Sequence, residues 1–206
     1  MPKVKVPRKS TAIDMTAMCD VASLLLTFFI LTATARQPEP LPVDTPSSTV
    51  KIKLPTTNIA TLTVGNGKVF FGVAGQTVRE RLLDRMGERY KIQFTPDEKK
   101  RFSLMESFGA PIGSLKQVIA LGNDERNKPG VQPGIPADSV GNVASELHEW
   151  IINARYATKE VNNEELRITI KGDSKEEYPA VKRIIDILQK QQVNRFSLIT
   201  SLEAAD

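Results

Sequence analysis

Asp20 is the only charged residue in the stretch 15–35, and its neighbours are apolar or carry hydroxyl groups. A carboxylate in apolar surroundings favours protonation or a bound cation, because either one neutralises its charge. At 100° per residue on a helix, the hydroxyl residues that lie within about 60° of it are Thr16, Ser23, Thr27 and Thr34. We therefore predict that Asp20 and this polar stripe face another protein surface or a water path.

The residues that common enzyme and metal sites need are missing from the sequence. The chain has one Cys and one His, which excludes an internal disulfide framework, a Cys-rich zinc module and a Cys–His nucleophile pair. His148 and Glu149 begin like a zinc-protease helix, but no second histidine exists. No G-x-S-x-G motif or phosphate-binding loop is found. We expect no enzyme activity, no cofactor and no metal site.

A transmembrane helix is predicted over residues 15–35, which would span about 31 Å, the thickness of a bilayer's hydrocarbon core. The positive-inside rule places the basic head, residues 1–14, in the cytoplasm and the rest of the chain across the membrane. A cleaved signal peptide is the alternative, because residues 33–35 read Ala-Thr-Ala, but Asp20 inside the apolar run disfavours it. The formal charge of +4 comes largely from this head and does not predict nucleic-acid binding.

Prolines separate the predicted anchor from a folded domain. Residues 36–48 contain four prolines and are predicted to form an extended linker. Beyond it, strands are identified by alternation of apolar and polar residues, and helices by 3.6-residue spacing. The predicted strands are 49–54, 59–64, 68–73, 166–171 and 193–200. The predicted helices are 77–90, 112–121, 145–157 and 178–191.

Two local signals predict how these strands pair. Gly65-Asn66-Gly67 is typical of a hairpin turn, and the strand–helix–strand pattern over 166–200 predicts a parallel pair with a right-handed crossover. Residues of about 95–142 are less regular and are interpreted as an insertion whose Pro129–Pro136 centre is a surface loop. The expected fold class is α+β: one N-terminal transmembrane helix, a Pro-rich linker, and a small mixed-sheet extracytoplasmic domain, 49–206, with helices packed on the sheet.

The segment 13–21, Ile-Asp-Met-Thr-Ala-Met-Cys-Asp-Val, resembles the start of the ExbD/TolR family. The family pattern reads Ile-Asn/Asp-hydrophobic-Thr-Pro-x-x-Asp-hydrophobic. Thr16 and Asp20 match its threonine and its essential aspartate, whereas Ala17 replaces the usual proline. An alternative alignment with the flagellar stator subunit MotB uses Asp14 instead, but it needs a gap and leaves Asp20 unexplained.

The C-terminal segment carries a second resemblance to this family. The family has a strand ending Arg-Ala-Asp, then Tyr-Gly, a helix and Val-Gly-Leu-Val-Thr. The corresponding residues here are Lys171-Gly172-Asp173, Tyr178-Pro179 and the sequence Phe-Ser-Leu-Ile-Thr at 196–200. The resemblance covers residues 10–73 and 145–200, and the residues between them exceed the family's usual small periplasmic domain.

The resemblance implies a single-pass protein of the bacterial inner membrane, with a cytoplasmic N-terminus and a periplasmic C-terminal domain. It implies an ExbD-like homodimer, in contact with membrane lipid and bound to an ExbB-like polytopic subunit. Such a complex uses the proton motive force to energise TonB-dependent outer-membrane transport by a TonB-like periplasm-spanning protein. Here Asp20 would be the ion-coupling residue, and the polar stripe around it would face the pore. The alternatives are a TolR- or MotB-like envelope-integrity or peptidoglycan-anchoring stator subunit, and a membrane-tethered periplasmic binding domain. One carboxylate favours a proton, and the nearby hydroxyls leave sodium open.

Overall fold

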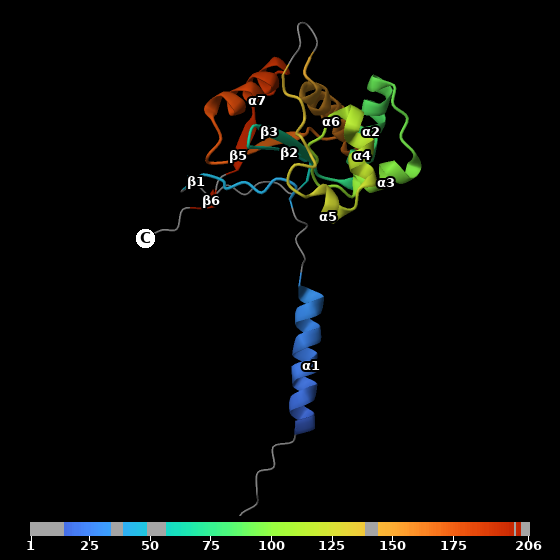
Figure 1. Ribbon diagram of the computed structural model, residues 1–206, viewed down its shortest axis with the longest axis vertical. Helices are drawn as coiled ribbons and strands as arrows, with labels where there is room; N and C mark the ends of the chain where they lie inside the picture. The colour runs from blue at the N-terminus through green and yellow to red at the C-terminus, as the bar shows by residue number, and fades with distance from the viewer. Residues whose placement is uncertain (1–14, 34–38, 49–56, 139–143, 200, 203–206) are drawn as a thin grey trace, which may run out of the picture. The chain divides into compact units, whose positions relative to one another are not determined.

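The computed structural model describes residues 15–33, 39–48, 57–138, 144–199 and 201–202. The chain divides into two compact units, unit 1 with residues 1–38 and unit 2 with residues 39–206. Figure 1 shows that unit 1 contributes one long helix, whereas unit 2 combines a sheet with several helices. This combination is the α+β class that the sequence predicts, with one N-terminal candidate transmembrane helix.

The helix of unit 1, α1, runs from Met15 to Thr32. None of its 18 residues is buried, and no proline or glycine interrupts it. Among the described residues, it is the one helix long and apolar enough to cross a membrane. It lies within the predicted range 15–35, of which Thr34 and Ala35 fall outside the described residues.

A four-stranded mixed sheet forms the centre of unit 2, with strand order β3-β2-β4-β5. Its strands are β2 (Ile59–Gly65), β3 (Lys68–Val73), β4 (Arg167–Gly172) and β5 (Phe196–Ile199). β2 and β3 form an antiparallel hairpin, while β4 pairs in parallel with both β2 and β5. The turn places Asn66 at φ 52° and Gly67 at φ 68°, values that Asn and Gly adopt with little strain. The predicted hairpin and the predicted parallel closing pair are both confirmed.

One face of this sheet is buried under helices. Leu62 of β2 is fully buried, and the register places it between Phe71 of β3 and Ile170 of β4, which are also fully buried. The helices predicted from spacing are α2 (Gln76–Tyr90), α6 (Glu146–Asn162) and α7 (Tyr178–Lys190). α2 and α6 lie side by side (Figure 1). Apolar residues of both join the same core, because their apolar positions recur every three to four residues.

The insertion of about 95–142 is more ordered than its sequence predicts. It contains α3 (Pro96–Ser103), α4 (Ile112–Ala120), which was predicted, and α5 (Asn123–Arg126). α3 was not predicted because its surface is mostly charged. Its start nevertheless carries a capping box, in which the Thr95 hydroxyl accepts from the Glu98 N–H and the Glu98 carboxylate accepts from the Thr95 N–H.

The prediction of a surface loop around Pro129–Pro136 is wrong for its central residues. Gln132 and Ile135 are each only 3% exposed. The Gln132 side chain accepts a hydrogen bond from the Gly109 N–H at 2.7 Å and donates one to the Arg126 carbonyl at 3.1 Å. A buried glutamine with both ends paired fixes the loop to the core, which prolines alone do not reveal.

The insertion also covers the outer edge of β3. Phe71 and Phe108 exchange two backbone hydrogen bonds of 2.8 and 2.9 Å, as neighbouring strands do. The Ile135 N–H donates to the Val69 carbonyl at 2.8 Å. The insertion thus occupies backbone groups that an edge strand would otherwise present to solvent.

Part of the predicted Pro-rich linker lies on unit 2. We call residues 39–46 the strap; after it, β1 (Ser47–Ser48) pairs in parallel with β6 (Ser201–Leu202). In the strap, Leu41 is only 9% exposed. The predicted strand 49–54 lies outside the described residues.

Candidate functional site

The predicted polar stripe lies on α1. The helix carries Asp20 with Thr16, Ser23 and Thr27, whereas Thr34 lies outside the described residues. All four side chains on α1 are exposed, and none of them is buried against the described parts of the chain. An exposed carboxylate in a helix of this hydrophobicity costs about 2.5–3.5 kcal/mol near the centre of a bilayer unless it gains a partner.

The hydroxyl groups next to Asp20 are bonded to the helix backbone. Ser23 Oγ donates to the Asp20 carbonyl at 2.9 Å, and Thr27 Oγ1 donates to the Ser23 carbonyl at 3.0 Å. This bonding is common for Ser and Thr in membrane helices. It uses the hydroxyl protons and leaves oxygen lone pairs directed away from the helix.

The Asp20 carboxylate has no such partner. Among the residues that the structure describes, no side chain donates a hydrogen bond or forms an ion pair with it. The neighbouring Ser23 hydroxyl serves the Asp20 carbonyl and not the carboxylate. Chemically, this arrangement suits a group that takes up a proton or a cation from another chain or from water.

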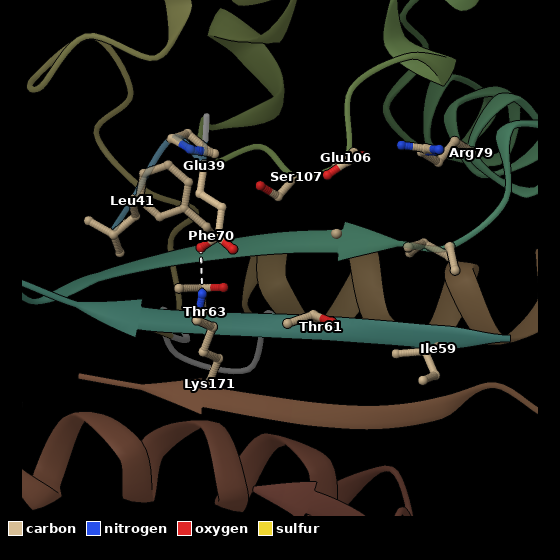
Figure 2. Close-up of a pocket in the computed structure, with 14 residues that line it drawn as sticks. Glu39, Leu41, Ile59, Thr61, Thr63, Phe70, Arg79, Glu106, Ser107 and Lys171 are labelled. Atoms are coloured by element: carbon tan, nitrogen blue, oxygen red, sulfur yellow. Dashed lines mark hydrogen bonds and ion pairs between the residues drawn. The ribbon is translucent and has the colours of Figure 1, made fainter. Parts of the chain in front are cut away.

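A second site candidate is a groove of about 350 Å³ on the sheet face opposite the helix-covered one. Figure 2 shows Thr61 and Thr63 of β2 and Phe70 of β3 along its floor, with Ser107 at its rim. Thr63 is only 8% exposed, and no hydrogen bond of its hydroxyl is found among the described residues. The groove therefore combines hydroxyl groups with an otherwise largely apolar lining.

Charged groups stand at both ends of this groove. At one end, Lys171 Nζ forms a 2.5 Å ion pair with the Glu39 carboxylate of the strap (Figure 2). At the other end, the Arg79 guanidinium donates to the Met105 and Gly75 carbonyls. Burial lowers the pKa of Arg79, and the nearby Glu106 carboxylate partly opposes this. Arginine stays protonated at physiological pH, so both ends keep a cation with a nearby carboxylate.

The strap closes the Lys171 end of the groove by packing over Gly65. A Cβ atom on Gly65 would lie 2.8 Å from Val43 Cγ1 and 3.3 Å from Leu41 Cδ2, so a larger residue would displace the strap. The backbone bond from the Ser174 N–H to the Asp44 carbonyl, 2.7 Å, holds the strap at the end of β4.

Sequence reasoning missed Glu39, Leu41 and Gly65 as parts of one site, because they meet only through tertiary contacts. The apolar Leu41 and Val43 between prolines were the available signal, since an exposed spacer has no need of them. Among the described residues, no group of three or more His, Cys, Asp or Glu side chains is placed to hold a metal ion.

Comparison with known proteins gives one family. A family model described as "ExbD: Biopolymer transport protein ExbD/TolR" matches residues 7–128, more than half of the chain. The match includes all of α1 with Asp20, the β2–β3 hairpin and much of the insertion. No curated protein and no solved structure matches this chain.

Proposed function

Because this chain belongs to the ExbD/TolR family, we propose that it is an ExbD-like subunit of an ion-driven inner-membrane motor, with Asp20 as the ion-coupling carboxylate. Membership supports a biopolymer-transport or energy-transducing subunit in general. Proteins of this family are transport-associated and non-enzymatic, and they work in membrane complexes with ExbB/TolQ and TonB/TolA-type partners. The family and the apolar α1 suggest a single-pass inner-membrane protein.

The observation that carries the proposal is the state of Asp20 within its own chain. Its carboxylate is exposed on an apolar helix and has no partner among the described residues. Such a group is costly unless a partner chain or a proton neutralises it. We infer that an ExbB-like polytopic subunit surrounds this face of α1, in a complex with two copies of the chain.

Asp20 would couple ion flow to movement because its two protonation states prefer different surroundings. The neutral acid can face lipid-like apolar surfaces and can donate to hydroxyl lone pairs, whereas the anion requires a polar or cationic surface. Each elementary charge that crosses 100 mV releases about 2.3 kcal/mol, which is enough to bias a two-state element with a small energy gap.

The orientation follows from the charges that flank α1. The cations before α1 lie within residues 1–14, which places the N-terminus in the cytoplasm by the positive-inside rule. Unit 2 would then lie in the periplasm, where it could contact a TonB-like protein that energises outer-membrane uptake. A reporter enzyme that is active only outside the cytoplasm, fused after Asp206, should be active.

The decisive experiment is Asp20→Asn, tested by growth that depends on active outer-membrane uptake. Asn keeps the size and hydrogen-bonding capacity of Asp but cannot ionise near neutral pH. We expect normal membrane abundance by immunoblot and complete loss of uptake, with partial activity for Asp20→Glu. Full uptake together with an intact envelope in Asp20→Asn at normal abundance would refute the ion-coupling role.

The matched control is Asp14→Asn, which removes a carboxylate six residues earlier in the sequence. We expect it to retain most of the activity, because this residue lies before α1 and at the predicted cytoplasmic interface. Loss of activity in Asp14→Asn with full activity in Asp20→Asn would favour the MotB-like alignment. Loss of envelope integrity instead of uptake in Asp20→Asn would assign the chain to a Tol-type system.

A further inference from the structure

The strap lies on unit 2 in an extended conformation with alternating burial. Leu41 is buried, Val43 and Thr45 are half-buried, and the residues between them are exposed. Prolines at positions 40, 42 and 46 favour this conformation, because the residue before a proline is excluded from the helical region. Proline also has no N–H group, so an extended segment rich in proline has fewer backbone donors that need a hydrogen-bond partner.

Three features of unit 2 recognise three different features of the strap. Lys171 pairs with the Glu39 carboxylate, and the lysine side chain is only 19% exposed. The bare backbone of Gly65 admits the aliphatic groups of Leu41 and Val43. The Ser174 N–H then binds the strap backbone at Asp44. Together, these three contacts favour a segment in which an acidic residue is followed by aliphatic residues at alternate positions.

Among the described residues, the strap lines one end of the groove that Figure 2 shows. Glu39, Pro40 and Leu41 line the Lys171 end, and the cavity of about 350 Å³ continues past Thr61 toward Arg79. An extended segment seated at Lys171 could therefore continue across the sheet, where hydroxyl groups and the charged side chains of Arg79 and Glu106 would meet its backbone and polar side chains.

We propose that Lys171, Gly65 and the adjoining groove form a docking site for an extended Glu-Pro-aliphatic-Pro-aliphatic segment of another envelope protein, which replaces the strap. The strap, Glu39-Pro40-Leu41-Pro42-Val43, shows the chemistry that the site accepts. The ion pair supplies charge selection, and the prolines keep the ligand extended, which lowers the entropy lost on binding. This site is separate from Asp20 and does not depend on ion coupling.

The strap competes with any such segment because it is tethered to the site. A short tether gives an effective concentration in the millimolar range, so an external segment binds weakly until the strap is displaced. Glu39 is 54% exposed and Leu41 lies outside the main hydrophobic core, so displacement needs no unfolding of that core. Release of the strap should therefore raise the affinity for an external segment about tenfold or more.

The test measures binding of a fluorescent peptide with the sequence of residues 37–44 to the full-length chain in detergent. The double variant Glu39→Ala/Leu41→Asp should release the strap and bind this peptide at least tenfold more tightly than the unmodified chain. Adding Lys171→Glu should abolish binding, and a peptide with Lys in place of its Glu should restore it. Lys182→Glu, the same charge change on the exposed side of α7, should leave binding unchanged.

Three results would overturn the proposal. The first is that the double variant does not bind the peptide although circular dichroism shows that unit 2 is folded. If the double variant does not fold, the single variant Glu39→Ala replaces it and should show an intermediate gain in affinity for the peptide. The second is equal binding with and without Lys171→Glu. The third is that the unmodified chain self-associates, that the double variant does not, and that no external peptide binds to the released site. This result would mean that the groove binds the strap of a second copy of the chain.

Discussion

The candidate transmembrane helix α1 and unit 2 satisfy their polar groups in opposite ways. On α1 the Ser23 and Thr27 hydroxyls bond to the helix itself, and the Asp20 carboxylate is left without a described partner. In unit 2, buried polar side chains pair with distant segments. Gln132 bonds to Gly109 and Arg126, and within the described residues only one buried side-chain atom, the Gln191 amide oxygen, lacks a partner. Among the described residues, the buried polar side chains of unit 2 are therefore paired within the unit, whereas the Asp20 carboxylate on α1 is exposed and is proposed to meet another chain.

Of the substitutions that test this comparison, Trp150→Ala should have the largest effect on the stability of unit 2. Trp150 is fully buried, and its ring lies 4.7 Å from that of Phe108 and 6.3 Å from that of Phe102, centroid to centroid. Removing it should lower the unfolding free energy of unit 2 by about 3–5 kcal/mol, because the cavity cannot fully collapse. Urea unfolding followed by circular dichroism measures this, and membrane insertion should stay normal. Tyr178→Ala, at a 70% exposed position, is the control with little expected change.

A smaller effect should follow from Gln132→Leu, which tests whether buried polar pairing stabilises unit 2. It leaves the Gly109 N–H and the Arg126 carbonyl without partners in the interior, at a cost of about 1–3 kcal/mol. Gln191→Leu is the matched comparison, because only the amide nitrogen of Gln191 is paired, with the His148 carbonyl. We expect a lower urea midpoint for Gln132→Leu than for Gln191→Leu. Equal midpoints would show that the pairing of Gln132 does not distinguish the two sites.

Glu146 should give unit 2 a smaller, pH-dependent contribution. Burial raises the pKa of this carboxyl group, although hydrogen bonds from Trp150 and the Ile112 N–H partly oppose the shift. The folded state therefore holds the proton more tightly than the unfolded chain. The resulting stabilisation is full below the ordinary Glu pKa and is lost as pH rises through the raised pKa. Melting temperatures across this window should fall with pH in the unmodified chain relative to Glu146→Gln. Parallel curves would contradict the shift.

The smallest effect on stability should come from Ser23→Ala and Thr27→Ala. Their hydroxyls bond only to their own helix, so the melting temperature of unit 2 should not change. If the stripe faces a partner, each variant should weaken but not abolish uptake, because a lost lone pair removes one polar contact and no titrating group. A shift in the melting temperature of unit 2 would contradict the claim that the hydroxyl groups of α1 do not contribute to the stability of unit 2.

Local signals in the sequence were sufficient for much of the fold. Gly65-Asn66-Gly67 predicted the hairpin, and the spacing of apolar residues predicted α2, α4, α6 and α7 within a few residues. α3 was missed because its helix signal lies in the Thr95–Glu98 capping box and not in apolar periodicity. The loop at Gln132 was predicted to be on the surface from its prolines, which do not reveal that the Gln132 side chain is buried and bonded to Gly109 and Arg126.

The two candidate sites differ in the same respect. Asp20 could be selected from the sequence because a single acid in an apolar stretch is unusual by itself. The groove could not, because Glu39 and Lys171 are separated by 132 residues and come together only when β4 is placed in the sheet. Prolines in the strap also hide its position, since they indicate a lack of regular structure but not a lack of contacts.

The cover over the outer edge of β3 has a consequence for aggregation. An open, apolar strand edge is a template on which other chains can grow, and β3 carries the adjacent aromatic residues Phe70 and Phe71. The backbone groups of Phe108 and Ile135 bond to Phe71 and to the Val69 carbonyl at this edge. A strand of another molecule therefore cannot form these hydrogen bonds. In the folded chain, the insertion therefore protects this edge of the sheet from pairing with a strand of another molecule.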